Sequence, residues 1–491
     1  MKKNEKKVLI INLGGMIYLL IYTMKEGIIM KENKGFTGQL GFVLAAAGSA
    51  VGVGNLWRFP YLAAKDGGGV FLILYLAMVF TVGFALLTTD LAIGRRTGKS
   101  AVYAYQSMSK KWKFLGIFTF FVPVIIMTYY AVIGGWILNY IRLFLTGNMT
   151  LAAEDTYFSS FIASDTSVYC GLIFMALTSI IVLGGVEKGI ERVSKIIMPI
   201  LLIMVVGIAI FSLTLKSTGD NGQVRTGIQG LAVYLKPDFT GMTLGRFLQI
   251  ALDAMSQLFF SLSVSMGIMI TYGSYVKKDV NLAKSVSFIE IMDTAVAMLA
   301  GVMIIPAVFV FLGVEGMSAG PGLMFISLPK VFFQMGPVGQ IIGLVFFILA
   351  GFAALTSCIS VLESIVANSI EILGTSRKNT TIVASIIYLI ATAVIALGYS
   401  KFYVEVSLPN GSTGQLLDLM DYISNSFMMP LIALLSSIFI GWIMKPDWII
   451  EEVEHGGVKF NRKKLYVVIV KYVLPIIMFI LFMISTGIFS Y

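Results

Sequence analysis

Charged residues, histidine and cysteine are all scarce in this sequence of 491 residues. Lys, Arg, Asp and Glu make up only 13% of it, His455 is the single histidine, and Cys170 and Cys358 are the only cysteines. Because both cysteines lie inside apolar runs, they predict neither a disulfide framework nor a metal site. One histidine in a polar loop leaves almost no candidate for histidine-based catalysis. So few charges also exclude a water-soluble protein, which could not cover this much apolar surface.

Hydrophobic residues make up 57% of the chain, and its mean hydropathy is +0.89. Glycine (49 residues) and methionine (27 residues) are frequent, as expected where helices pack closely in lipid. A membrane-spanning helix needs about 20 apolar residues. We therefore predict an all-α integral membrane protein with eleven spans, at about residues 40–60, 69–93, 115–146, 167–184, 190–214, 244–273, 284–312, 337–373, 379–398, 412–445 and 463–488.

The formal net charge of +10 is placed in a way that orients these spans. Segment 95–113 holds six Lys and Arg residues, whereas loop 147–166 holds none, and this alternation continues along most of the chain. Basic loops stay on the cytoplasmic side of a membrane. We therefore predict a cytoplasmic N-terminus and, with eleven spans, a C-terminus outside. The charge indicates topology and not a nucleic-acid partner.

Two of the predicted spans are interrupted by small and polar residues. The first contains GSAVGVGN at 48–55, and the sixth contains SLSVSMG at 261–267. They lie five spans apart, in matching positions of two five-span halves, which is the sequence pattern of a midplane site between inverted repeats. Close packing through small residues explains either break alone, but explains both together less well. Unwound helix offers N–H groups to an anion and carbonyls to a cation, so sodium with a zwitterionic amino acid fits.

Longer strings connect these breaks with a known family. Residues 41–60, GFVLAAAGSAVGVGNLWRFP, closely resemble the first-span signature of the neurotransmitter:sodium symporter family. Its later motifs are resembled, in the same order, by YYAVIGGW (129–136), KGIERVSKIIMP (188–199), SQLFFSLSVSMG (256–267), ITYGSYVKKD (270–279) and FAALTSCIS (352–360). The resemblance covers about residues 36–491 and is closest to bacterial, eleven-span members. It implies the leucine-transporter-type fold, with two inverted five-helix repeats plus an eleventh span, in the plasma membrane of a bacterium.

This fold divides the chain at predictable places. We expect the first repeat, spans one to five, at 36–214, the second, spans six to ten with extracellular loops, at 215–445, and a cytoplasmic loop with span eleven at 446–491. Residues 1–35 are an N-terminal extension and cytoplasmic segment. We expect translation to begin at Met30, because Lys25-Glu26-Gly27 can be encoded by a ribosome-binding sequence. The rival interpretation is an N-terminal membrane anchor.

The resemblance also implies two sodium ions, which prefer hard oxygen ligands. The first site takes the carbonyl of Ala50 with Asn55, Ser261 and Asp293, whose carboxylate inside an apolar span is functional by default. The second takes the carbonyls of Gly48, Val51 and Ala353 and the hydroxyls of Thr356 and Ser357. Residues three and four apart share one helix face. The alternative for the two hydroxyls is a bond back to their own helix.

The family's amino-acid pocket maps onto the same two breaks. The amides of Val53 and Gly54 and the Tyr130 hydroxyl would meet the substrate carboxylate, although Tyr130 could instead be an ordinary interfacial tyrosine. Gly52 stands where monoamine carriers of the family have an aspartate, which binds the amine of substrates that lack a carboxylate. The glycine therefore favours true amino acids as substrates. Carbonyls of Ala50, Phe260 and Ser261 with the Ser263 hydroxyl would hold the ammonium, and Ile126, Met266, Ser357 and Val361 would line the side-chain subsite. Ser265 stands where the family usually has glycine, and its added side chain would narrow the expected pocket.

Access to the pocket is expected to be controlled at both ends. Arg58 and Asp421 match the family's outer gate, above Phe260, and Tyr275 and Glu371 match parts of its inner gate. Asn33 and Phe36 stand where the family has an arginine and a tryptophan of the inner gate, and Lys31 or Lys34 could substitute there. In span five, Gly189 and Pro199 match a family feature at which the helix either unwinds or is statically kinked.

These residues together predict a symporter and not an enzyme. It would import a hydrophobic or aromatic amino acid with sodium by alternating access, and no obligatory protein partner is expected. Asp293, combined with Ala297 where chloride-dependent members have a serine, predicts chloride-independent transport. Two alternatives remain open: an amino-acid-binding membrane sensor without transport, and a proton-driven amino-acid permease of the same fold.

Overall fold

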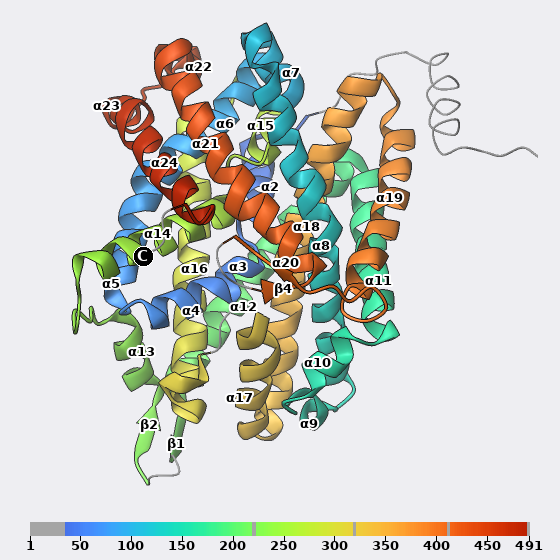
Figure 1. Ribbon diagram of the computed structural model, residues 1–491, viewed down its shortest axis with the longest axis vertical. Coiled ribbons are helices and arrows are strands. Elements are labelled where there is room, and N and C mark those ends of the chain that lie inside the picture. The colour runs from blue at the N-terminus through green and yellow to red at the C-terminus, as the bar shows by residue number, and fades with distance from the viewer. Residues whose placement is uncertain (1–34, 219–221, 318–320, 410–412, 489–491) are drawn as a thin grey trace, which may run out of the picture.

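Long helices run through the molecule from one end to the other (Figure 1), and most of them are apolar. The computed structural model describes residues 35–218, 222–317, 321–409 and 413–488. Within these ranges, nine helical segments are long and apolar enough to cross a membrane, and the bent pair Gln39–Ala50 and Val53–Lys65 makes a tenth. The predicted sixth span forms two helices separated by residues 263–267. All eleven predicted apolar runs are therefore helical, and the all-α prediction is confirmed.

The spans follow the chain in the predicted order. They are α2 (Gln39–Ala50) with α3 (Val53–Leu56) and α4 (Arg58–Lys65); α5 (Gly69–Met78) with α6 (Phe84–Thr97); α8 (Lys113–Leu145); α11 (Asp165–Leu183); α12 (Arg192–Thr214); α14 (Leu244–Leu262) with α15 (Ile268–Ser274); α16 (Leu282–Leu312); α18 (Pro337–Leu373); α19 (Arg377–Leu397); α20 (Leu416–Asp421) with α21 (Met429–Ile438); and α23 (Lys463–Val468) with α24 (Leu474–Ser485). Wider π-helical turns join or extend several of them, at Val79–Gly83, Val186–Glu191, Tyr422–Met428, Phe439–Ile443 and Ile469–Val473.

Short elements cover the two ends of the bundle. One end, called the α7 end below, carries α7 (Ala101–Met108) and α22 (Asp447–Val453). The opposite end carries α9 (Met149–Ala152), α10 (Tyr157–Ile162), α13 (Gly227–Leu235), α17 (Leu328–Gln334) and the hairpin of β1 (Lys216–Thr218) with β2 (Val224–Thr226). A second hairpin pairs β3 (Val406–Ser407) with β4 (Thr413–Gly414).

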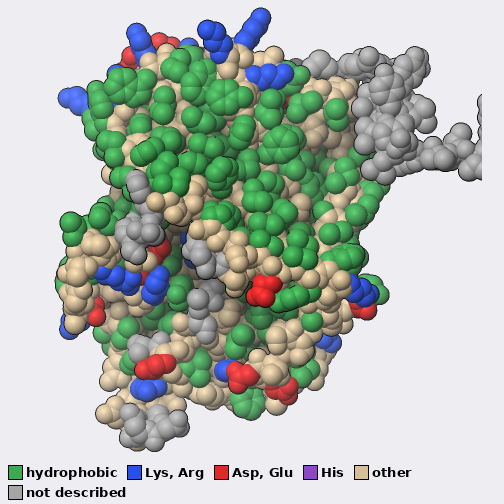
Figure 2. All heavy atoms as spheres, viewed as in Figure 1, with side chains coloured by type: hydrophobic (Ala, Val, Ile, Leu, Met, Phe, Trp, Pro, Cys, Tyr) green, Lys and Arg blue, Asp and Glu red, His purple; other side chains and the backbone are tan. Residues whose placement is uncertain are grey.

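The outer surface matches a lipid environment. Figure 2 shows a mostly hydrophobic face below a rim of Lys and Arg side chains at the α7 end. Isoleucines point outward on three of the spans, at Ile173 and Ile180 of α11, Ile203 and Ile210 of α12, and Ile386 and Ile390 of α19. Apolar side chains exposed at this density are stable only against hydrocarbon.

Two helices near the α7 end are packed backbone to backbone. A Cβ on Gly94 of α6 would lie 1.9 Å from the carbonyl oxygen of Ile270 in α15. A Cβ on Gly273 of α15 would lie 2.4 Å from the carbonyl oxygen of Leu91 in α6. Only glycine permits such an approach. The second half of span six is thereby joined closely to span two.

Candidate substrate and ion site

The breaks in spans one and six face each other in the middle of the molecule. Span one bends by 59° between α2 and α3. The carbonyl of Ser49, at the end of α2, accepts hydrogen bonds from Ser263 Oγ at 2.9 Å and from Ser357 Oγ of α18 at 3.2 Å. A residue at the first break thus contacts both the second break and the eighth span, which is the meeting point predicted from the two sequence interruptions.

The restarted first span begins with glycines that leave room around its N-terminus. Gly52 has extended backbone angles (φ −114°, ψ −175°), and its N–H donates to Asn55 Oδ1 at 3.2 Å. The first N–H groups of a helix lack intrahelical acceptors, so those of Val53 and Gly54 suit a carboxylate. A Cβ on Gly54 would lie 2.3 Å from the Phe260 ring, which therefore covers this turn directly.

Three of the four residues assigned to the first sodium site form one buried cluster around a carboxylate. Asn55, Ser261 and Asp293 are each 0% exposed. Asn55 Nδ2 donates to Asp293 Oδ1 at 2.9 Å, and Ser261 Oγ lies 2.8 Å from Asp293 Oδ2. Ala50, which would add its carbonyl, ends α2 and is 1% exposed. A buried carboxylate bonded to an amide and a hydroxyl, with no ion pair to a described Lys or Arg, fits a hard cation.

The residues assigned to the second sodium site bring α2 and α18 into contact. A Cβ on Gly48 would lie 3.3 Å from Thr356 Cβ, so the two helices touch at this point. Thr356 Oγ1 bonds back to the carbonyls of Phe352 and Ala353 at 3.0 and 3.2 Å, whereas Ser357 Oγ bonds across to α2. Thr356 therefore bonds back to its own helix, which is the alternative that the sequence left open for both hydroxyls, whereas Ser357 does not. Val51, in the break itself, is fully buried.

Of the residues expected to line the substrate pocket, Tyr130 and Ser357 lie beside the restarted first span. A Cβ on Gly52 would lie 3.2 Å from Tyr130 Oη and 3.1 Å from Ser357 Oγ, so both hydroxyls face the restarted span. Tyr130 is 5% exposed and is not an interfacial tyrosine at the membrane surface. The remaining subsite residues are buried on α8, the second break and α18, as Ile126, Met266 and Val361.

The second break is strained and is held by a residue that the sequence prediction missed. Ser263 and Ser265 have φ angles of 52° and 62°, a left-handed conformation unfavourable for residues other than glycine. Asp90 of α6, 3% exposed, accepts the Ser265 N–H at 2.9 Å. The sequence signal that could have identified Asp90 is its carboxylate inside the apolar run 69–93. The side chain of Ser265 is buried beside the pocket, at 3% exposure.

The two residues expected to form the outer gate, Arg58 and Asp421, are bound to other partners. Arg58 donates to Ser256 Oγ of α14 at 2.6 Å. Asp421 accepts from Tyr129 Oη at 2.9 Å and from Asn425 Nδ2 at 2.6 Å. The structure thus forms no ion pair between Arg58 and Asp421. Closing this gate would require the two side chains to exchange their present partners.

The residues expected at the inner gate, Tyr275 and Glu371, are likewise bound to different partners. Tyr275 Oη donates to Glu363 Oε1 at 2.7 Å, and Glu363 also pairs with Arg377, whose Nη1 lies 2.9 Å from the same oxygen. Glu371 accepts the N–H of Ser100 at 2.9 Å and its hydroxyl at 3.1 Å. Glu363, a carboxylate in the apolar run 337–373, was also missed by the sequence prediction.

Phe36, which is expected to replace the family's inner-gate tryptophan, packs against two tyrosines of the sixth span. Its ring centroid lies 5.5 Å from Tyr272 and 6.2 Å from Tyr275, and its N–H donates to the Tyr275 carbonyl at 3.2 Å. A Cβ on Gly35 would lie 2.3 Å from that carbonyl oxygen. The other positions considered there, Lys31, Asn33 and Lys34, and the proposed start at Met30 lie outside the described residues.

Span five is continuous at the position where unwinding was considered. Residues Val186–Glu191, which include Gly189, form a π-helical turn that leads into α12, and Pro199 lies inside that helix. A Cβ on Gly189 would be 2.1 Å from the carbonyl oxygen of Ile181, so glycine is required by close packing. Unwinding at this point stays a prediction.

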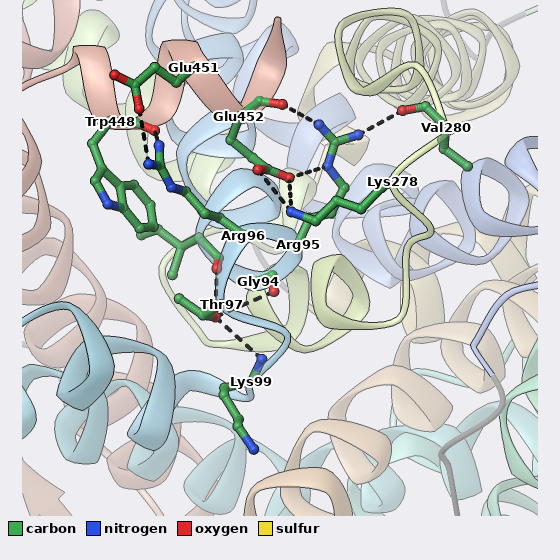
Figure 3. Close-up of polar contacts among 11 residues, drawn as sticks. Gly94, Arg95, Arg96, Thr97, Lys99, Lys278, Val280, Trp448, Glu451 and Glu452 are labelled. Atoms are coloured by element: carbon green, nitrogen blue, oxygen red, sulfur yellow. Dashed lines mark hydrogen bonds and ion pairs between the residues drawn. The ribbon is translucent and has the colours of Figure 1, made fainter. Parts of the chain in front are cut away.

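An ionic cluster at the α7 end joins three segments (Figure 3). Arg95 of α6 is 3% exposed; its Nε lies 2.7 Å from Glu452 Oε1 of α22, and its Nη1 lies 2.7 Å from the Val280 carbonyl. Lys278 Nζ lies 2.8 Å from the same Glu452 carboxylate. The buried charge of Arg95 is fully paired, so this contact joins α6, the loop after α15, and α22.

Two ion pairs join the end of span one to α14, the first helix of span six. Arg246 Nη2 lies 2.8 Å from Asp66 Oδ1, and Lys65 Nζ lies 3.2 Å from Asp253 Oδ2. Burial, followed by the nearby Asp253 carboxylate, raises the pKa of Asp66 to about 6. The second oxygen of Asp66 has no hydrogen-bond partner. The folded protein therefore binds a proton at Asp66 more tightly than the unfolded chain does.

This raised pKa gives Asp66→Asn a pH-dependent effect on stability. An unfolded aspartate titrates near pH 4, so the Asp66 contribution to stability falls as pH rises from about 4 to about 6 and then stays constant. We expect the melting temperature of Asp66→Asn, relative to wild type, to be higher at about pH 7.5 than at about pH 4.5. Thermal unfolding in detergent measures this difference. An equal difference at both pH values would show that Asp66 titrates alike in both states.

Known proteins share both the sequence and the fold of this chain. The sequence profile of the Sodium:neurotransmitter symporter family matches residues 33–166 and 167–491. The uncharacterized sodium-dependent transporter YhdH of Bacillus subtilis is 34% identical over 473 residues, which cover 94% of this chain and 100% of that protein. The uncharacterized sodium-dependent transporter MJ1319 of Methanocaldococcus jannaschii is 29% identical and covers 86% of this chain.

A solved structure extends this likeness to three dimensions. The crystal structure of MhsT in complex with L-phenylalanine superposes with a TM-score of 0.79 at 36% identity, covering 92% of this chain and 99% of that chain. This match confirms the predicted leucine-transporter-type fold. The relatives are transporters, so the prediction that this protein is not an enzyme is also confirmed. The chain belongs to the Sodium:neurotransmitter symporter family.

Proposed function

We propose that this protein imports a hydrophobic or aromatic amino acid together with sodium by alternating access. The observation that carries the proposal is the meeting of the two breaks, where the Ser49 carbonyl bonds to Ser263 and Ser357. The N-terminus of α3 suits an anion, and the buried Asp293 carboxylate suits a cation. The bound L-phenylalanine of MhsT is an amino acid of the proposed class.

The apolar lining supports the proposed class of substrate. Ile126, Met266 and Val361 are each 3% to 4% exposed around the pocket and offer no charge to a polar side chain. The two proposed sodium sites would be those around Asp293 and Thr356. The α7 end, with its Lys and Arg rim, would face the cytoplasm of a bacterial cell. Domain boundaries at residues 36, 215 and 446 agree with the positions of the helices but remain proposals.

Counterflow in proteoliposomes tests transport itself. Vesicles loaded with unlabelled phenylalanine and placed in labelled phenylalanine should accumulate label in sodium, and much less in choline or in a proton gradient alone. A sensor binds the amino acid without exchange, and a proton-driven permease exchanges equally well without sodium. A thermal-shift screen of the amino acids, with and without sodium, then identifies the preferred substrate.

Gly52→Asp should abolish amino-acid binding while leaving the fold intact. A Cβ at this position meets the Tyr130 and Ser357 hydroxyls at 3.2 and 3.1 Å, so a carboxylate would lie where the substrate carboxylate is proposed. Like charges at this distance strongly oppose each other in a site with little water. We expect sodium-dependent phenylalanine binding to fall by about a hundredfold or more, measured by scintillation proximity. Gly52→Ala should bind more weakly than wild type but better than Gly52→Asp; equal binding by the aspartate variant would contradict the proposed orientation.

A further inference from the structure

A buried carboxylate of span five binds the chain just before the first helix. Glu191 is 1% exposed and accepts the backbone N–H of Thr37 at 2.8 Å on Oε2, while the Thr37 hydroxyl contacts Oε1. Lys195 Nζ, one turn further along the fifth span, lies 2.6 Å from the same Oε1 and 3.5 Å from the Thr37 hydroxyl. Lys277 also contacts Thr37, with its Nζ 3.5 Å from the Thr37 carbonyl oxygen.

The contact extends into the first turns of α2. A Cβ on Gly41 would lie 2.1 Å from Glu191 Oε1, so α2 rests directly on the carboxylate. Gly38, which caps α2, offers no side chain to its N–H groups. A helix N-terminus favours a nearby negative charge. Glu191 therefore supplies, from another helix, the anionic group that α2 lacks in its own sequence.

We propose that Glu191 is the positioning residue that latches the first half of span one closed at the α7 end. This inference rests on the proposed alternating access, in which α2 must separate from span five to open the pocket toward the cytoplasm. Thr37 would then leave Glu191. Its partner Lys195 is 41% exposed and belongs to the same span, so the carboxylate keeps a charged partner during opening. The latch can therefore release without leaving a bare buried charge.

The contact around Arg95 provides a contrast at the same end of the molecule. Arg95 and Glu452 have side chains only 1% and 5% exposed, and they come from different elements. Separating them would leave a buried guanidinium without its carboxylate, which is far more costly. The Arg95 cluster (Figure 3) is therefore expected to stay intact. The Glu191 contact, in contrast, has the partners that a reversible contact requires.

Distance measurements between spin labels test the latch without any transported substrate. Labels at Leu40→Cys on α2 and Ile196→Cys on α12 would sit on exposed positions, which are 66% and 56% exposed. Both labels would be introduced into a variant in which the native cysteines, Cys170 and Cys358, have been replaced. Glu191→Gln preserves the shape of the side chain but removes its charge. Since a hydrogen bond to a charged group typically contributes a factor of about ten or more, we expect the long-distance population to rise about tenfold relative to the short one.

Matched variants make this experiment decisive. Thr37→Val should shift the distances in the same direction as Glu191→Gln, because it removes the hydroxyl from the other side of the contact. Lys195→Met should shift them in the opposite direction, since release would then leave the carboxylate without a partner, and this outweighs the loss of the longer 3.5 Å contact between Lys195 and the Thr37 hydroxyl. Glu187→Gln, which removes an exposed acid from the same turn, should match the parent protein. The proposal is overturned if Glu191→Gln and Glu187→Gln give the same distance distribution. Because no amino acid is added, this outcome is separate from failure of the transport proposal.

Discussion

Sodium-driven uptake should be abolished when Thr356 and Ser357 are both replaced by alanine. Their hydroxyls lie where α18 touches the end of α2, and Ser357 already bonds to the Ser49 carbonyl at 3.2 Å. A bound sodium ion would take these oxygens together with the carbonyls of Gly48, Val51 and Ala353. A hard cation that loses two of five oxygen ligands is bound far more weakly. We expect initial uptake to fall by about two orders of magnitude, because each lost ligand costs about 1–3 kcal/mol.

Uptake of the labelled substrate into proteoliposomes, in sodium and in choline, measures this effect. Ser385→Ala is a suitable control, since its hydroxyl bonds back to Thr381 of its own helix at 2.7 Å. That variant should transport at the wild-type rate. High sodium should partly rescue the single variants Thr356→Ala and Ser357→Ala, but not the double variant. Full uptake in choline, or full uptake by the double variant, would show that this site does not bind the coupling ion.

Chloride removal should leave the initial rate of uptake nearly unchanged, whereas Asp293→Asn should eliminate it. Asp293 is fully buried and is bonded to Asn55 and Ser261, the proposed ligands of the first sodium. A fixed negative charge beside a cation replaces a mobile anion, because opposite charges attract strongly where water is sparse. Ala297, one turn further along α16, has no hydroxyl with which to hold chloride. Replacing chloride by gluconate in the uptake buffer is the direct measurement.

The polar groups around Asp293 indicate how chloride dependence could be created. Tyr75 Oη and Gln257 Oε1 are buried and have no hydrogen-bond partner. Gln257 lies one turn before Ser261 on α14, and its Nε2 is 3.4 Å from the Gly54 carbonyl. Asp293→Asn combined with Ala297→Ser should therefore recover uptake in chloride but not in gluconate. If the wild type already stops in gluconate, Asp293 does not provide the balancing charge.

The sequence predicts the places where helices break more reliably than it predicts which side chains meet. Gly and Ser clusters at 48–55 and 261–267 are local signals, and the structure breaks at 51–52 and 263–267. The partners of Asp90, Glu191 and Glu363 depend on how spans pack, which a single sequence does not contain. The same limit applies to the gates, where Arg58 and Asp421 are suitably charged but bind Ser256 and Tyr129.

The glycine contact between α6 and α15 determines which helices at the α7 end can move together. Gly94 and Gly273 hold the two helices too closely for one to tilt alone, and Arg95 fastens the same pair to α22 through Glu452. Any tilt of α15 would therefore carry α6 and α22 with it as one unit. Trp448 of α22 lies with its ring 4.4 Å from the Arg96 guanidinium of α6, so this contact belongs to the same unit and is kept while the unit moves.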